Sequence, residues 1–272
     1  MELTAQHFAE LRRAKMLLEK PSLVARITDA VGTPIELGFE MLPEKWAQSI
    51  HQAVHVSLTR ALQVGIRSLN SRPEQDVRKG LHNLAAAAAG ATGGAFGLAG
   101  VALELPISTT IMLRSIAAIA RSEGEDLASL ESRLSCLEVF ALGGRSPADD
   151  ASETGYFAVR SALAKSVTEA ARHIAQKGMT DAGAPALIRF ITAVGSRFGI
   201  VVSEKAAAMA IPAIGAAGGA IVNSIFINHF QDVASGHFVV RRLERAYGKE
   251  VVERVYRQID VATPSRAAKR GT

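Results

Sequence analysis

Two apolar stretches of this chain carry the same hexapeptide pattern, G-A-x-G-G-A, at residues 90–95 and 215–220. Each lies in a run without formal charge, 21 residues long over 83–103 and 26 residues long over 206–231. As helices these runs would be about 31 and about 39 Å long, close to the roughly 30 Å hydrocarbon core of a bilayer. Water tolerates such helices poorly, so the chain must hide them inside a helical bundle or in lipid.

Glycines recur four residues apart within both stretches, which places each pair on one face of a helix. A glycine face lets two helix backbones approach closely, although each glycine costs about 1 kcal/mol of helix propensity relative to alanine in an exposed helix. We therefore expect these segments to pack against each other or another element, or to insert into a membrane. The glycines predicted to do so are Gly90, Gly93, Gly94, Gly97, Gly215, Gly218 and Gly219.

Apolar residues recur at three- and four-residue spacing nearly throughout the chain, and only 5% of its residues are aromatic. This pattern favours closely packed helices over strands. The sequence predicts an all-α fold, a multi-helix bundle around the two Gly/Ala-rich apolar segments, which are similar by internal duplication or by composition alone. The helices are expected at 3–20, 22–31, 44–70, 73–89, 106–123, 127–142, 156–177, 185–210, 212–230 and 235–258.

The best candidate for a break between two halves is the polar segment 143–155. We expect N-terminal amphipathic helices over 1–42, the main helical domain over 43–258 and a flexible basic tail over 259–272. The first twenty residues are charged throughout and contain no apolar core of a secretion signal, so a cytoplasmic location is expected. The single Cys136 excludes an internal disulfide and a thiolate metal cluster.

The net charge of +5 is unevenly distributed, with an acidic region at 123–153 and a basic region at 241–257. A basic end attracts anionic lipid or nucleic acid. The aromatic residues near it stand at helical spacing typical of a core, so no nucleic-acid partner is expected. The alternative is a solvated helix face on which Glu and Arg form pairs. The candidates for contact with lipid headgroups are Arg241, Arg242 and Arg245.

Few polar residues interrupt the apolar runs or border them. Glu104 is the only formal charge between Asn83 and Leu113, while Asn223 and His229 lie in the second run. A carboxylate in apolar surroundings must be paired or protonated. We therefore consider a pair between Glu104 and His229, against the alternative that Glu104 lies at a hydrated helix boundary.

Motifs of catalytic or cofactor sites are absent from the sequence. No Lys follows the glycines as in a phosphate-binding loop, and neither G-x-G-x-x-G, G-x-S-x-G nor S-x-x-K occurs. His51 and His55 lie one helical turn apart but have no third ligand in the pattern of a zinc site. The sequence therefore predicts a protein that is not an enzyme, with no metal and no cofactor.

The chain resembles the EcsC family of bacterial proteins. The resemblance is carried by Pro43-Glu44-Lys45, the glycine tract, the segment LPISTTIMLRSIA at 105–117 and the closing LERAYG at 243–248. It implies an all-α, cytoplasmic, membrane-associated protein without an assigned reaction, and an association with an ABC transporter. The residue before Gly124 departs from the family pattern, because Glu123 stands where an aromatic is usual.

From these observations we expect a non-enzymatic protein at the cytoplasmic face of the inner membrane. Its partners would be an anionic membrane surface and an ABC transporter. The apolar segments would span the membrane, enter it conditionally or stay in a soluble core. The alternative is a soluble helical protein, a binding module or an enzyme, that encloses a hydrophobic small ligand between the two glycine segments.

Overall fold

A computed structural model describes residues 2–19, 22–68, 97–144, 155–178, 184–211 and 215–260 of the chain. Helices account for the regular structure in these ranges, and no strand occurs there, so the all-α prediction is confirmed. The helices are α1 (Ala5–Leu18), α2 (Leu23–Val31), α3 (Glu36–Glu40), α4 (Trp46–Ser68), α6 (Gly97–Ser122), α7 (Leu130–Leu142), α9 (Gly155–Lys177), α10 (Pro185–Ala210), α11 (Gly215–Tyr247) and α12 (Lys249–Gln258).

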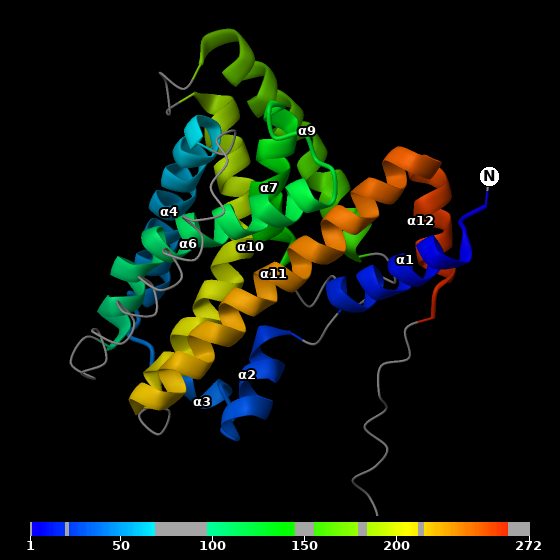
Figure 1. The fold of residues 1–272 in the computed structure, drawn as a ribbon. Coiled ribbons are helices and arrows are strands. Elements are labelled where there is room, and N and C mark those ends of the chain that lie inside the picture. Colours follow the sequence, from blue (N-terminus) through cyan, green and yellow to red (C-terminus); the bar gives the residue numbers. More distant parts are fainter. Residues whose placement is uncertain are drawn as a thin grey trace, which may run out of the picture.

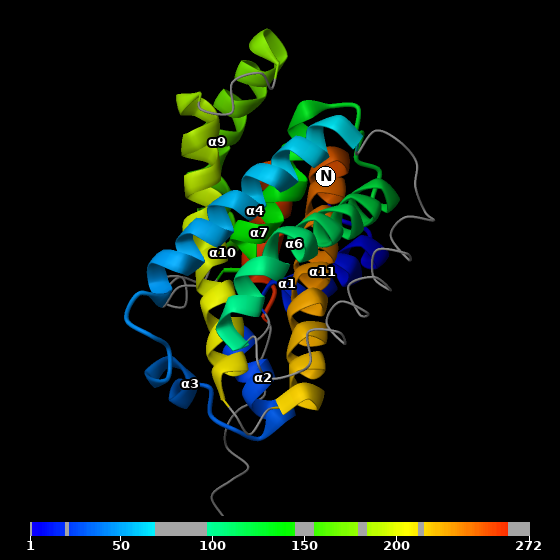
Figure 2. The same ribbon diagram turned by 90° about the vertical axis from the view of Figure 1, so that its left-hand side faces the viewer.

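Two long helices organise the bundle (Figures 1 and 2). Helix α10 packs against α4, α7 and α9 and also contacts α2, α3, α6 and α11. Helix α11 crosses the molecule diagonally and carries α1 and α12 on its C-terminal half, while α4 and α6 lie together on the other side of the bundle. The buried apolar side chains form one core that runs from Leu11 to Ile259.

Aromatic rings join the middle of this core. Phe140 of α7, Phe198 of α10 and Phe230 of α11 lie with ring centroids 4.9 to 5.5 Å apart, in tilted and edge-to-face arrangements. Aromatic pairs prefer such geometries because of the charge distribution of their rings. All three side chains are buried. Aromatic side chains therefore fill the place where α7, α10 and α11 meet.

Helix α6 differs from its prediction, because Pro106 lies inside it rather than at its start. Proline removes one backbone hydrogen bond and usually ends a helix. Here the helix continues because α4, α10 and α11 pack along it. The hydroxyls of Ser108 and Thr110 donate to the backbone oxygens of Leu105 and Pro106, at 3.1 and 2.8 Å.

Helix α11 is also longer than predicted: it is continuous through 231–234, where the sequence predicted a break between two helices. Val233 and Ala234 are buried there. Gly236 does not end the helix but lets α1 approach, since an added Cβ would lie 2.7 Å from Leu18 Cγ and 2.9 Å from the Ala14 oxygen. The chain turns only at Gly248, whose φ of 87° suits glycine.

Helix α3 was not predicted, because Gly32, Pro34 and Gly38 suggested a loose segment. In the structure Gly38 is the point at which α3 crosses α10, and a Cβ at this position would lie 2.0 Å from the Ala207 oxygen. The close approach holds a five-residue helix against the C-terminal part of α10. The predicted helix at 73–89 lies outside the described residues.

Candidate functional site

A buried lysine lies at the junction of the three helices that carry or adjoin the apolar segments. Lys205 of α10 is 1% exposed. Its Nζ donates to Asn223 Oδ1 of α11 at 2.9 Å, pairs with Glu104 Oε1 of α6 at 3.3 Å, and lies 4.6 Å from the ring centroid of Phe226. Burial lowers the pKa of Lys205, and the charge of Glu104 partly offsets this effect. The ammonium thus connects α6, α10 and α11.

Two of the three candidate buried polar residues, Glu104 and Asn223, therefore come together, but His229, which was considered as a partner of Glu104, lies elsewhere. His229 lies six residues beyond Asn223, about 9 Å further along α11. Its Nε2 is 2.8 Å from the Gly143 oxygen and its Nδ1 is 3.4 Å from Arg26 Nη1. His229 is buried, whereas Glu104 and Asn223 are half-buried.

Lys205 itself was not among the residues predicted from the sequence. Lys205 directly precedes the uncharged run at 206–231 and so lies outside it. The signal in the sequence was the run of alanines directly after Lys205, Ala206, Ala207 and Ala208. The structure buries all three, and a lysine next to a buried helical segment needs a partner.

Only part of the predicted glycine packing falls within the described ranges. Gly90, Gly93 and Gly94 lie outside them, Gly97 begins α6 and Gly215 begins α11. Gly218 is buried, and a Cβ at Gly219 would lie 3.3 Å from Met209 Cε of α10. Helices α6 and α11 do pack against each other, but Gly219 faces α10.

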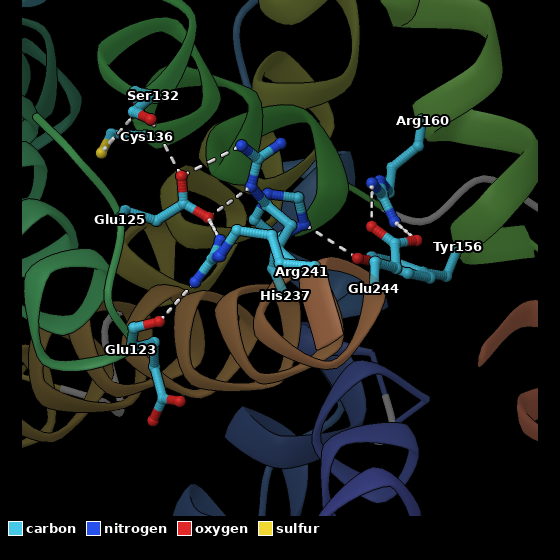
Figure 3. A network of polar contacts seen from close by, with 10 residues as sticks. Glu123, Glu125, Ser132, Cys136, Tyr156, Arg160, His237, Arg241 and Glu244 are labelled. Carbon is cyan, nitrogen blue, oxygen red and sulfur yellow. Dashed lines mark hydrogen bonds and ion pairs between the residues drawn. The ribbon is translucent and has the colours of Figure 1, made fainter. Parts of the chain in front are cut away.

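The second charged cluster lies on the C-terminal half of α11 (Figure 3). Glu125, between α6 and α7, is buried and accepts hydrogen bonds from Arg241 at 2.8 and 3.0 Å, from Arg245 and from the Ser132 hydroxyl at 2.9 Å. Burial raises the pKa of Glu125, but the hydrogen bond and charge of Arg241 outweigh it and hold the pKa below its ordinary value. This carboxylate joins α11 to the turn after α6.

The three arginines predicted to contact lipid headgroups all have carboxylate partners within the chain. Arg241 and Arg245 pair with Glu125, and Arg245 also donates to the Glu123 backbone oxygen at 2.6 Å. Arg242 pairs with Glu10 of α1 and with Glu123, both at 2.7 Å. Two carboxylates of the acidic region, Glu123 and Glu125, thus pair with arginines of the basic region, and these guanidinium groups are engaged in holding the fold together.

The same region of α11 contacts α9 through a buried polar group (Figure 3). Arg160 forms a two-pronged pair with Glu244, at 2.8 and 2.9 Å. Beside it, the Tyr156 hydroxyl is 2.9 Å from His237 Nδ1, and burial lowers the pKa of His237 well below its ordinary value. A neutral imidazole is therefore expected here at physiological pH.

The described residues contain no group of three His, Cys, Asp or Glu side chains that could hold a metal ion. The thiol of Cys136 is buried, donates to the Ser132 backbone oxygen at 3.3 Å, and has its pKa raised by burial. A protonated, buried thiol is a poor nucleophile. The charged clusters of the described ranges thus have the character of helix-joining contacts.

Glu204 provides a test of the electrostatics beside Lys205. Burial raises its pKa to about 7, against the effect of a hydrogen bond from the Val24 backbone. A carboxyl group whose pKa is raised on folding stabilises the fold most below its unfolded pKa of 4.5, and this contribution is lost as the pH rises through about 7. We expect Glu204→Gln to raise the free energy of unfolding at pH 8 by about 2–3 kcal/mol.

Denaturant unfolding at pH 5 and pH 8 measures this effect. The gain from Glu204→Gln should be large at pH 8 and small at pH 5, while Glu131→Gln, at an exposed site of α7, should change neither value. An equal effect of Glu204→Gln at both pH values would show that Glu204 ionises normally in the folded chain.

Comparison with known proteins supplies the family. The model of the EcsC protein family matches residues 5–243, from the start of α1 into the cluster of arginines on α11. No curated protein and no solved structure matches this chain. The matched range includes the Lys205 cluster and nearly the whole helical bundle. The chain belongs to the EcsC protein family.

Proposed function

We propose that this chain is a non-enzymatic protein of the cytoplasm that binds the inner membrane through the end of the bundle formed by α3. The observation that carries the proposal is a set of apolar side chains exposed on α3 and just after it. Leu37 is 51% and Met41 50% exposed, and Phe39 is also exposed. Isolated exposed apolar residues are common, but three of them on a short helix and the residue after it are typical of a segment that lies at a membrane interface.

The same end of the molecule contributes further apolar surface. Gly38 places α3 against Ala207 of α10, and Gly219 places the first turns of α11 against Met209 of the same helix. Ile221, two residues beyond Gly219, is exposed. Figures 1 and 2 both show α3 and the beginning of α11 at one end of the bundle. We infer that these side chains face a bilayer together.

Charge distribution favours peripheral or conditional contact over permanent spanning. One helix of the described ranges, α10, is long and apolar enough to cross a membrane by length and composition. Its central place in the bundle accounts for the same property. It also contains Arg189, Arg197, Glu204 and Lys205, and a charge near the bilayer centre costs about 3 kcal/mol on insertion scales. Helix α10 is therefore better suited to the core of the bundle.

Vesicle flotation of the full chain tests the proposal. We expect the wild-type chain to float with vesicles, and the triple variant Leu37→Ser, Phe39→Ser, Met41→Ser to float about a hundredfold less well, since burying each such side chain contributes on the order of 1 kcal/mol. The matched control is Val56→Ser with Ile188→Ser, which removes exposed apolar side chains from α4 and the opposite end of α10. A wild-type chain that stays in solution with every vesicle would contradict the proposal.

We also propose that the chain has a protein partner, an ABC transporter that it supports. This proposal follows from the family resemblance and predicts that the chain co-purifies from membranes with such a transporter. Changes to Leu37 and Met41 that abolish membrane binding should then reduce recovery of the complex. Recovery of the chain without any transporter, under conditions in which it floats with vesicles, would leave lipid as its sole partner.

A further inference from the structure

Helix α1 is fixed to the bundle by an inner face on which the polar groups are paired. Lys15 is buried, and its Nζ donates to the backbone oxygens of Tyr256 and Ile259 at 3.0 and 2.8 Å, where α12 ends. A cation at a helix C-terminus satisfies carbonyl groups that lack helical partners. His7 Nδ1 lies 2.7 Å from the Tyr247 hydroxyl. The helix is thus oriented uniquely, with one face inward and one face outward.

The outer face of α1 combines exposed apolar side chains with exposed arginines. Phe8 is 45% and Met16 43% exposed, and Arg12 and Arg13 are exposed between them. Residues 8, 12 and 16 stand one helical turn apart, so they form a stripe along one side of the helix. Within the described ranges neither arginine forms an ion pair.

The carboxylate nearest in sequence to this stripe is that of Glu10, and it pairs with α11 rather than with the arginines of α1. Glu10 pairs with Arg242 at 2.7 Å and accepts a hydrogen bond from the Gln6 amide at 2.9 Å. The contact with Arg242 has the larger effect, and both lower the pKa of Glu10. The outer face of α1 therefore keeps two positive charges, Arg12 and Arg13, that no described residue neutralises, in contrast to the arginines of the Glu125 cluster on α11.

We propose that this outer face of α1, defined by Phe8, Arg12, Arg13 and Met16, is the part of the chain that recognises anionic lipid headgroups. The guanidinium groups match phosphate in charge and geometry, and the two flanking apolar side chains match the interfacial zone below the headgroups. The inference rests on the proposed membrane function and assigns its lipid preference to α1, separately from the apolar contact of α3.

Flotation with two vesicle compositions tests the assignment, one of phosphatidylcholine alone and one of phosphatidylcholine with phosphatidylglycerol. The full chain should prefer the anionic vesicles, and Arg12→Gln with Arg13→Gln should weaken its partition onto them by about tenfold or more while leaving neutral vesicles unaffected. Added salt should reduce wild-type binding to the level of the variant. The matched control, Arg60→Gln with Arg67→Gln on exposed sites of α4, removes the same charge and should keep the preference.

The outcomes separate this inference from the function on which it rests. If the Arg12 and Arg13 variant keeps the anionic preference, or if the α4 control loses it equally, the role of α1 is overturned while membrane binding stands. If the wild-type chain binds neither vesicle, the membrane function itself fails. Thermal unfolding of both variants should match that of the wild type, since all four side chains are exposed.

Discussion

Replacing Glu125 with alanine should lower the free energy of unfolding by about 3 kcal/mol, because it removes the shared partner of two arginines in a buried site. The carboxylate is buried and accepts from Arg241, Arg245 and Ser132. Its loss leaves the Arg241 guanidinium half-buried beside Arg160 and without its acceptor. Denaturant unfolding of the full chain at neutral pH measures the change.

Two further measurements identify the cause. The pKa of Glu125 is lowered in the fold, so its contribution is present above the unfolded value of 4.5 and is lost as the pH falls through the folded value. The difference between wild type and Glu125→Ala should therefore shrink in acid. Glu169, whose 2.8 Å pair with Arg189 lies at the surface, is the control, and Glu169→Ala should have little effect. Equal losses for the two variants would contradict a buried role for Glu125.

The second large effect is an asymmetry between the two partners of the Lys205 pair. Glu104→Leu should destabilise the fold by about 3 kcal/mol, because it leaves the ammonium of a fully buried side chain without its counter-ion. Lys205→Met should cost less than about 1 kcal/mol, since methionine matches the shape of the lysine stem and Glu104, which is half-buried, can turn to water. The double variant should recover most of the loss.

A double-mutant cycle measures this coupling directly. The pH dependence of stability has a definite sign: burial lowers the pKa of Lys205, so the ammonium is less favoured in the folded than in the unfolded chain, and the fold gains stability as the pH rises toward the unfolded value of 10.5. Glu104→Leu should enlarge this gain, because it removes the charge that favours the ammonium. Additive effects of the two single changes would mean that Glu104 and Lys205 do not interact.

Much of the helical framework could be predicted because its boundaries depend on local chemistry. Helix α10 has its predicted bounds, 185–210, with Pro185 in its first turn, where proline needs no hydrogen bond. Two errors came from a proline or glycine whose role is tertiary. Pro106 and Gly38 suggest breaks locally, but packing of other helices against α6 and α3 decides these positions. The predicted helix at 235–258 is instead divided at Gly248, whose positive φ turns the chain.

The candidate sites were only partly predictable. Glu104 and Asn223 stood out as isolated polar residues in apolar surroundings, yet Lys205, which connects them, is set by three helices far apart in sequence. The acidic and basic regions were both visible, but the pairing of Glu125 with Arg241 spans 116 residues. Composition revealed which charges exist, and only the fold determines which of them pair with each other and which, such as Arg12, have no ion pair in the described part of the chain.

The central claim is that the α3 end of the bundle meets the acyl chains of a membrane. It is tested most directly by tryptophan quenching with brominated lipid, because the chain has one tryptophan, Trp46. In a Trp46→Phe background, Phe39→Trp should be quenched strongly on binding to brominated vesicles, and Ile188→Trp, at the other end of α10, should not. Equal quenching of the two reporters, or quenching of Ile188→Trp alone, would contradict the proposed orientation.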